Sequence, residues 1–463
     1  MGVQRALQAI LDSVGRRALG STITFFEHEP LEFPWTDHDL ASLERLRRLV
    51  GCEVLRPTVR HGVRSLQATQ QVGVIRLGDR TVQVLPKMYK SSPVVDEKTR
   101  AREATHNLLH LLAYAGKLPI SESIVAPLLR RDADWFEILT SLFARHLTEH
   151  WQLGAHRTYQ AVDDELPVLK GKWRLTDQLR RPERKHIFAI SYDEFTADNP
   201  LNRVFRFVVE RLWHLTRVGQ NLRMLGELRQ WMDDVTLLPS VTVSAASPAL
   251  ITRLNQDCAP LLSLARLFLD QGALQLAAGD LNTYAFVFDM NRLFEAFIVA
   301  FIRRESHRVL PPTLAGCELL PYASGAARYL AKRAKRQVFQ LEPDLAFRYG
   351  GQFRLLIDAK YKQLDETSRR LGVSEEDFYQ MYAYAHRYRA PRVLLLYPQV
   401  AGVSSDLGGL FTIEDEDKEI TVATVDLRND LGRSEERQKL ADRLRALLEK
   451  DDGHGVANQE LAV

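Results

Sequence analysis

Two aspartates and a lysine form the most reactive pattern in the chain, because Asp344 follows a proline and Asp358 stands two positions before Lys360 in RLLIDAK. Residues i and i+2 of a strand point to the same face, so the Asp358 carboxylate and the Lys360 ammonium should project together from the end of an apolar strand. Two carboxylates on facing strands hold magnesium with several waters still attached. A metal so held lowers the pKa of a bound water, while a nearby lysine positions that nucleophile or balances charge in the transition state. The pattern predicts phosphodiester hydrolysis.

The loop through Gly350 and Gly351 decides whether Asp344 joins this site. A two-residue turn at the glycines would pair Asp344 with Ile357 and direct the carboxylate to the opposite face of the sheet. An odd-length loop centred on Gly351, or a bulge with the same effect, pairs Asp344 with Asp358 instead. We expect the odd loop or the bulge. Taken alone, an aspartate and a later Asp-x-Lys are more typical of a salt bridge at a strand end, because charged residues are common.

Two helices are expected to flank these strands. The segment EEDFYQMYAYAHRY carries Gln380 and Tyr384 four positions apart, so both can face the same neighbour. Glu295 lies upstream in MNRLFEAFI, on a helix with an apolar stripe. The plain alternatives are a solvated glutamine, a core tyrosine and an ordinary helix glutamate.

Together with EPD and DAK, these elements resemble the PD-(D/E)xK nucleases, and the Gln-x-x-x-Tyr element resembles their RecB-like branch. Many nucleases of that fold place a glutamate from the first helix beside the metal, and the glutamine and tyrosine lie close to the catalytic carboxylates and to DNA. The resemblance implies Mg²⁺ or Mn²⁺ as the cofactor and three carboxylate ligands, from Asp344, Asp358 and Glu295. The catalytic set that it implies consists of these ligands together with Lys360, Gln380 and Tyr384.

Positive charge precedes Asp344 in the sequence. The segment from Pro321 to Leu341 has no acidic residue and five basic ones, which are Arg328, Lys332, Arg333, Lys335 and Arg336. Such a run can neutralise phosphates and bind DNA in a salt-dependent way. We expect it to contact DNA, although a solvated basic loop is the usual form of a charge run.

The pattern changes along the chain, which at 463 residues exceeds what one hydrophobic core usually supports. We expect a multidomain α+β protein with a β-rich module over residues 1–96 and a mainly helical region over 97–284. A PD-(D/E)xK nuclease domain of α/β type follows over 285–432, because its order is helix, strands, helix, strand. A C-terminal helix and a frayed tail occupy 433–463.

Local signals support this division. The clearest hairpin is VGVIRLGDRTVQVLP, in which Gly78 and Asp79 separate two alternating strands. The clearest helix is DNPLNRVFRFVVERLW, which Asp198 or Asn199 can cap, with Pro200 in its first turn. Between the helices, YQAVDDELPVLKGKWRL is interpreted as a connection with a short strand.

The composition narrows the possible classes of protein. A net charge of +3 argues neither for nor against nucleic acid, so any DNA-binding surface must be local. The three cysteines match no zinc or redox spacing, which fits a reducing compartment. No stretch approaches the roughly 20 apolar residues of a membrane span, and the first residues lack the apolar run of a signal peptide. We expect a cytoplasmic protein with no membrane contact.

The chain as a whole resembles the McrC family, the nuclease subunits of McrBC modification-dependent restriction systems. The resemblance covers roughly residues 70 to 400 and rests on motifs in the expected order. Lys170 stands where arginine is commoner in the family, within ELPVLKGKW. The other matching segments are VGVIRLGDRTVQVLPKM, YDEFTADNPLNRVFR, MNRLFEAFI, EPD and DAK.

This resemblance implies a division of labour. McrC proteins work with McrB, a AAA+ GTPase ring whose attached domain reads DNA, often at methylated cytosine, and the N-terminal part of McrC inserts into the ring and stimulates nucleotide hydrolysis. The present chain has no G-x-x-x-x-G-K-S/T phosphate loop, so it cannot power translocation itself. The expected role is that of an endodeoxyribonuclease subunit in antiphage defence, acting on double-stranded, modified DNA with an McrB-like hexamer. The alternatives for this chain are a regulatory adaptor that does not cleave and a RecB-like repair nuclease that acts alone. The alternative for its partner is a ring that uses ATP.

Overall fold

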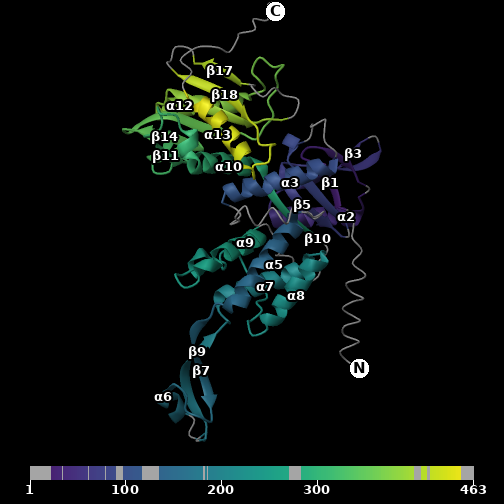
Figure 1. Ribbon diagram of the computed structural model, residues 1–463, viewed down its shortest axis with the longest axis vertical. Coiled ribbons are helices and arrows are strands. Elements are labelled where there is room, and N and C mark those ends of the chain that lie inside the picture. The colour runs from purple at the N-terminus through teal and green to yellow at the C-terminus, as the bar shows by residue number, and fades with distance from the viewer. Residues whose placement is uncertain are drawn as a thin grey trace, which may run out of the picture.

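The computed structural model describes residues 22–33, 35–60, 62–78, 80–89, 97–116, 135–180, 183–184, 186–270, 283–400, 408–413 and 418–449. They form a mixed α/β multidomain structure with several sheets and a long projecting arm (Figure 1). No described helix is both long and apolar enough to cross a membrane.

A four-stranded sheet dominates the N-terminal part, with the order β1-β6-β5-β10. Its strands are β1 (Thr22–Phe26), β5 (Gln71–Leu77), β6 (Arg80–Leu85) and β10 (Thr283–Asp289). The hairpin β5–β6 is the one expected from the sequence, since Leu77 pairs with Arg80 across two turn residues. Gly73 permits the close approach of β10, because a Cβ there would lie 2.2 Å from the Phe286 carbonyl oxygen.

The strand β10 lies far along the chain from its partner β5, yet the two pair antiparallel over their length. The N-terminal sheet is therefore completed by a strand that crosses the expected boundary at residue 284 into the expected nuclease domain. The division at 96, 284 and 432 stays a prediction. A smaller sheet beside it contains β2 (Pro30–Glu32), β3 (Leu55–Arg60) and β4 (Val63–Ala68), and helix α2 (Asp37–Val50) packs against β5 and β10.

Helices fill the middle of the molecule. Helix α7 begins where the sequence indicates, because the Asn199 side chain accepts a hydrogen bond from the Asn202 amide and Pro200 opens the first turn. Its apolar residues, among them Leu201, Phe205 and Leu212, are buried. The helical elements of this region are η1 (Lys87–Tyr89), α3 (Glu97–Tyr114), α5 (Trp135–Gly154), α7 (Pro200–Leu215), α8 (Gly219–Trp231), η2 (Pro248–Leu250), η3 (Gln256–Cys258) and α9 (Ala259–Asp270).

An arm projects from these helices (Figure 1). Its frame is an antiparallel pair of nine-residue strands, β7 (Thr158–Leu166) and β9 (Phe188–Thr196), with the short strand β8 (Lys172–Trp173) and helix α6 (Leu175–Leu179) near the tip. The interpretation of this segment as a connection with one short strand was wrong in extent. Its sequence lacks the alternation of a half-buried strand, because both faces of β7 stay at least partly exposed.

A six-stranded sheet forms the C-terminal part, with the order β11-β14-β15-β16-β18-β17. The strands are β11 (Glu318–Pro321), β14 (Leu345–Tyr349), β15 (Gln352–Ala359), β16 (Arg392–Pro398), β17 (Gly408–Thr412) and β18 (Glu419–Val425). The helices are α10 (Met290–Arg304), α11 (Ser306–Val309), α12 (Glu375–Tyr388) and α13 (Ser434–Leu448). A separate hairpin joins β12 (Arg328–Arg333) to β13 (Arg336–Leu341).

Alternate residues of the central strands belong to two different cores. Ile357 packs into the core that also contains α10 and α13, whereas Leu356 packs into the core that contains Met381 of α12. The sheet is thus covered on both faces, as expected for parallel strands with near-continuous apolar sequence. Asp358 interrupts this pattern on the α12 face, at the end of β15.

Candidate active site

The register of β14 and β15 follows the bulge alternative. The turn between the strands consists of Gly350 and Gly351, both with positive φ, so Tyr349 pairs with Gln352. The pairing then shifts by one residue at a bulge, and Leu345 pairs with Ile357. The expected odd-length loop is absent, but the expected effect of the bulge is confirmed.

Asp344 and Asp358 stand at the next positions of the shifted ladder, beyond Leu345 and Ile357. Directly opposed residues of an antiparallel pair point to the same face, so both carboxylates face α12. They are 6% and 1% exposed. The Asp344 Oδ2 atom accepts a hydrogen bond of 2.7 Å from the Ala359 amide, which fixes one carboxylate against the other strand.

Lys360 completes the strand end. Its amide donates to the Leu396 carbonyl of β16 at 2.8 Å, so the backbone is held by the sheet. Its Nζ atom lies 2.7 Å from Asp358 Oδ2. This ion pair is the contact made by the buried Oδ2 atom, and it holds the ammonium against the strand end.

The electrostatics of this cluster disfavour negative charge. Burial and then the Asp358 charge raise the pKa of Asp344 well above its usual range. Burial likewise raises the pKa of Asp358. Burial also raises the pKa of Glu295 on α10, and the Lys360 charge only partly offsets this rise. Burial lowers the pKa of Lys360, but attraction to Asp358 outweighs it, so the lysine pKa is raised and its charge is retained. Three carboxyl groups beside one ammonium form a site whose charge a further cation can balance.

This donor set fits a hard divalent ion, because buried carboxylate oxygens are the ligands that Mg²⁺ and Mn²⁺ prefer. Glu295 is half-buried and feels the charges of Asp358 and Lys360. The three carboxylates do not form one of the described groups whose ligand atoms all lie within 4.8 Å of one another. Asp344 and Asp358 are opposed on neighbouring strands, and Glu295 adds a third carboxylate from α10.

Gln380 and Tyr384 come to the same face of the sheet. The Gln380 amide donates to the Tyr384 hydroxyl at 2.7 Å, as their helical spacing allows. Tyr384 is buried, and its pKa is raised by that burial and then by the nearby Asp358 charge. The helix α12 begins at a Ser374 cap, which fixes where this pair sits along the sheet.

The five basic residues lie on the β12–β13 hairpin rather than beside the carboxylates. All of them are exposed, and the tip turns at Ala334 and Lys335, both with positive φ. The hairpin is tied to α12 through a hydrogen bond from Arg387 Nε to the Tyr329 carbonyl. A cavity of about 730 Å³ adjoins it and is lined by four arginines, which are Arg328, Arg354, Arg387 and Arg389.

Two groups beside the site were missed by the sequence argument. Tyr322 is 48% exposed and has a positive φ; burial and then the charges of Asp344 and Glu295 raise its pKa. No local pattern distinguishes it from an ordinary loop tyrosine. The second group is Glu27 with Lys87, which contact Tyr361 next to Lys360. The Leu-Pro-Lys motif that contains Lys87 indicated the N-terminal hairpin, but it did not indicate a contact between Lys87 and Tyr361.

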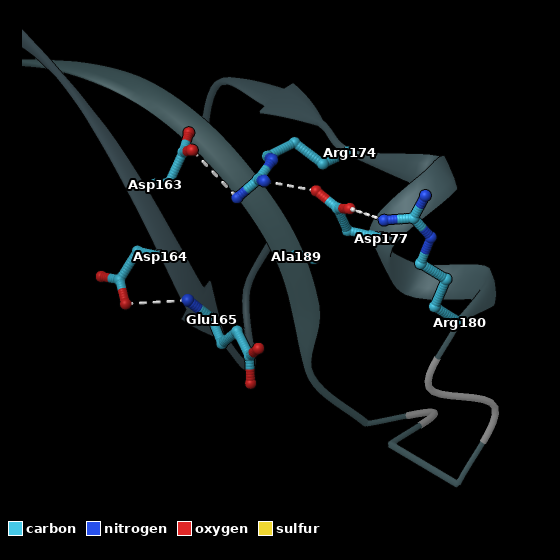
Figure 2. Close-up of a pocket in the computed structure, with 7 residues that line it drawn as sticks. All are labelled: Asp163, Asp164, Glu165, Arg174, Asp177, Arg180 and Ala189. Carbon is cyan, nitrogen blue, oxygen red and sulfur yellow. Dashed lines mark hydrogen bonds and ion pairs between the residues drawn. The ribbon is translucent and has the colours of Figure 1, made fainter.

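A second set of acidic residues lines a cavity of about 420 Å³ on the arm (Figure 2). Here Asp163 lies 3.1 Å from Arg174, and Asp177 pairs with both Arg174 and Arg180. Arginine partners already neutralise Asp163 and Asp177, in contrast with the three carboxylates around Lys360. This cavity therefore offers no comparable metal site.

Comparison with known proteins agrees with this architecture. The sequence model of the family described as McrBC 5-methylcytosine restriction system component matches residues 66–398. The fold is similar to a chain in a refined half-complex from a tetradecameric assembly of Thermococcus gammatolerans McrB AAA+ hexamers with bound McrC. That chain is 23% identical with a TM-score of 0.70, over 93% of this chain and 100% of its own length.

A chain of the cryo-EM structure of the Thermococcus gammatolerans McrBC complex also matches, at 25% identity and a TM-score of 0.49. The match covers 62% of this chain and 88% of that one. No curated protein sequence matches.

Proposed function

Since the chain belongs to the McrBC family of 5-methylcytosine restriction system components, we propose that it is a DNA endonuclease subunit that requires a divalent metal and a AAA+ GTPase ring. In this role it hydrolyses phosphodiester bonds once assembled with the ring and stimulates the ring's nucleotide hydrolysis. Its substrate is double-stranded DNA, modified where the partner recognises it, and its site is of the PD-(D/E)xK type. The observation that carries the proposal is the convergence of Asp344, Asp358 and Lys360 at one strand end, produced by the bulge in β14–β15.

The roles of the residues follow from their surroundings. Asp344 and Asp358 would hold Mg²⁺ or Mn²⁺, with Glu295 as a further ligand through water. Such an ion, when bound, polarises a phosphate oxygen and supplies a nucleophilic water at neutral pH. Lys360 stays charged beside Asp358, so it can orient the attacking water and balance the extra negative charge of the transition state.

Gln380 and Tyr384 support this site. Their mutual hydrogen bond leaves the second donor of the Gln380 amide free to turn toward a phosphate or a base. Tyr384 fills the space behind Asp358 on the α12 face and keeps its phenol neutral. We assign them positioning roles that sharpen the geometry of the two aspartates rather than direct chemistry.

The basic hairpin is suited to hold the DNA backbone. Its five exposed basic residues have no acidic neighbour on either strand, and the arginine-lined cavity extends the positive surface to the near end of β15. The Asp358 end of β15 lies about 20 Å further along, at roughly 3.3 Å for each residue of a strand. Phosphate contacts at that distance position a duplex without reading its sequence.

The arm is suited to contact the ring. It projects away from both sheets, and its apolar side chains are exposed in a way that soluble monomers seldom tolerate. Leu179 is 78% exposed and Tyr159 73%. The remaining exposed apolar side chains of the arm are Val168, Leu169, Trp173, Leu175 and Phe195. We infer that this surface binds the AAA+ partner.

Plasmid cleavage with defined components tests the proposal. The wild-type chain and Asp358→Ala are each incubated with modified plasmid and Mg²⁺, with and without the ring and GTP or ATP. We expect cleavage only by the wild-type chain with the ring and its nucleotide. Asp442→Ala removes an exposed aspartate of α13 and serves as the matched control.

Each alternative gives a different result. Cleavage that survives Asp358→Ala would remove the proposed site. Stimulated nucleotide hydrolysis without cleavage under any condition would identify an adaptor. Cleavage by the wild-type chain without any ring would identify a nuclease that acts alone.

A further inference from the structure

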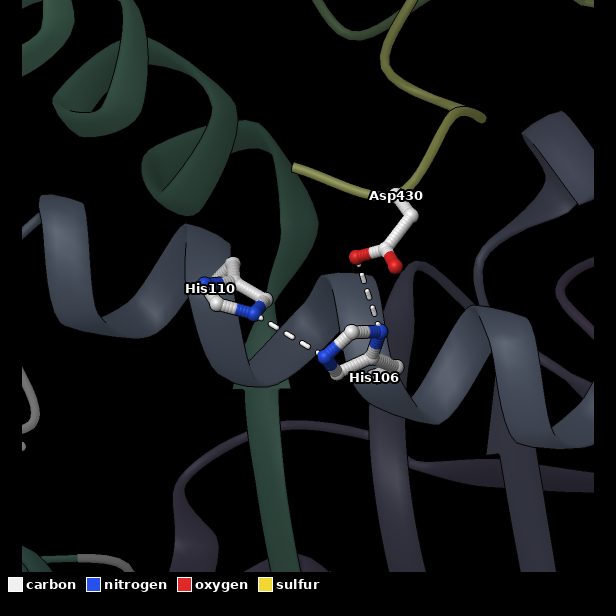
Figure 3. A group of neighbouring side chains, drawn as sticks. All are labelled: His106, His110 and Asp430. Atoms are coloured by element: carbon white, nitrogen blue, oxygen red, sulfur yellow. Dashed lines mark hydrogen bonds and ion pairs between the residues drawn. The ribbon is translucent and has the colours of Figure 1, made fainter. Parts of the chain in front are cut away.

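A second group of possible metal ligands lies outside the candidate active site, between α3 and the segment that follows β18 (Figure 3). His106 and His110 stand one helical turn apart on α3, so both face Asp430 across the contact. Their ligand atoms lie within 4.8 Å of one another. No part of the proposed cleavage reaction uses these side chains.

The two imidazoles face each other through nitrogen atoms. His106 Nε2 lies 3.0 Å from His110 Nε2, and His106 Nδ1 lies 3.1 Å from Asp430 Oδ1. A carboxylate at Nδ1 favours the tautomer with its proton there and leaves a lone pair on Nε2. A histidine that binds a metal through one nitrogen commonly donates its other N–H to a carboxylate in this way.

The backbone of Gly432 packs closely against these ligand atoms. A Cβ added to Gly432 would lie 2.8 Å from His110 Nε2, 2.9 Å from Asp430 Oδ1 and 3.3 Å from His106 Cε1. The φ of Gly432 is not in the left-handed region, so the backbone conformation does not require glycine. What requires glycine is the close approach of its backbone to the ligand atoms.

The imidazoles are suited to a metal by their protonation state, because the nearby Arg433 and Arg437 charges add to the effect of burial on their pKa values. Burial lowers the pKa of both imidazoles, so they are neutral near pH 7 and able to bind a metal. Arg433 Nε lies 3.2 Å from Asp430 Oδ2, on the oxygen that does not face His106. Asp430 therefore orients His106 and offsets positive charge at the same time.

We propose that His106 and His110 bind a divalent transition-metal ion of the zinc class, with Asp430 orienting His106. Imidazole nitrogens favour such ions over magnesium. Because Asp430 contacts His106, the ion would strengthen the contact between α3 and the segment before α13, which Asn107 already holds through a hydrogen bond of 2.9 Å to the Arg428 carbonyl. The site would fasten the helical region to the C-terminal sheet.

Zinc binding in a background without the candidate active site tests the proposal. The chain carrying Asp344→Asn and Asp358→Asn is freed of metal, and zinc binding is measured by titration calorimetry, with the absorption of bound cobalt as a second readout. We expect one zinc ion for each chain, no binding of magnesium, and a higher Tm with zinc. Adding His106→Gln and His110→Gln should abolish binding.

Two further variants keep the test independent of folding. Gly432→Ala should weaken zinc binding at least tenfold, because the new methyl group would lie 2.8 Å from His110 Nε2 and 2.9 Å from Asp430 Oδ1 and displace them. Gly219→Ala places its Cβ where nothing lies within 4 Å and should change nothing. Asp430→Asn should also weaken binding. The metal-free Tm of each variant reports whether the fold is intact.

Three results would overturn the proposal. The first is the absence of stoichiometric zinc at micromolar concentration, which would leave Asp430, His106 and His110 as a plain chain of hydrogen bonds. The second is zinc binding that survives both histidine substitutions. The third is loss of zinc in Cys258→Ser instead, which would point to the other described group, His150, Asp257 and Cys258.

Discussion

A buried glutamate in the N-terminal part should make stability depend on pH. Glu27 is 1% exposed, and its Oε2 atom accepts hydrogen bonds from the Lys87 amide at 2.9 Å and from the Tyr361 hydroxyl at 2.8 Å. Its other oxygen has no partner among the described residues. Burial raises the pKa of Glu27 from 4.5 to about 7, despite these hydrogen bonds and the Lys87 charge.

The direction of the effect follows from this rise. The folded chain keeps the Glu27 proton up to about pH 7, whereas the unfolded chain loses it near 4.5. The stabilisation is complete below pH 4.5, decreases as the pH rises toward 7 and is lost above it. Each unit of pH between the two pKa values changes the free energy of unfolding by roughly 1.4 kcal/mol. The free energy of unfolding therefore falls by about 3 kcal/mol between pH 5 and pH 8.

The substitution Glu27→Gln removes this titration while keeping the size of the side chain. We expect the Tm of the variant, relative to the wild-type chain, to rise by roughly 6–12 °C from pH 5 to pH 8, since 1 kcal/mol shifts Tm by roughly 2–4 °C in domains of 150–250 residues. Scanning calorimetry over this range measures the difference, with the exposed Glu227→Gln as the matched control. Parallel pH curves for the wild-type chain and Glu27→Gln would refute the reasoning.

Three other predictions concern separate parts of the molecule. Replacing Lys332 and Arg336 by alanine should reduce the slope of log K against log salt for duplex DNA by about two, since each phosphate contact contributes roughly 0.9, and an unchanged slope would remove the hairpin from the DNA surface. Gly73→Ala should lower the Tm by several degrees, because its Cβ would lie 2.2 Å from the Phe286 carbonyl oxygen, and a neutral effect in calorimetry would contradict this packing. Leu179→Asp on the arm should abolish stimulation of the ring's nucleotide hydrolysis while leaving Tm within about 1 °C, because the side chain is already exposed; full stimulation would place the ring contact elsewhere.

The sequence was informative about the strand end that carries the candidate site. The spacing of Asp358 and Lys360 predicted that their side chains share a face. The two glycines of the turn left a small number of possible registers, and the observed bulge gives one of them. Spacing could not tell a bulge from an odd-length loop, because both give the same pairing further along. The helical spacing of Gln380 and Tyr384 likewise predicted their contact. Metal ligation and catalysis by these residues stay predictions.

Long-range pairing was beyond local patterns. Strand β10 pairs with β5, which lies far away along the chain, and the apolar sequence of β10 does not indicate which strand it pairs with. The arm was underestimated because exposed strands lack the periodicity that burial imposes. The sequence also did not indicate the group formed by His106, His110 and Asp430. Its members come together only when α3 contacts the segment after β18.

The central claim is that Asp344 and Asp358 form the metal-dependent centre for DNA cleavage, and the single-turnover cleavage rate tests it most directly. The rate is measured for the wild-type chain, Asp344→Asn, Asp358→Asn and the control Asp442→Asn, each assembled with the ring and Mg²⁺, with nucleotide hydrolysis followed in the same reaction. We predict that both site variants lose at least about a hundredfold in cleavage rate, as loss of a group that stabilises a transition state does, while still stimulating nucleotide hydrolysis as the control does. Cleavage by Asp358→Asn at the control's rate would contradict the claim.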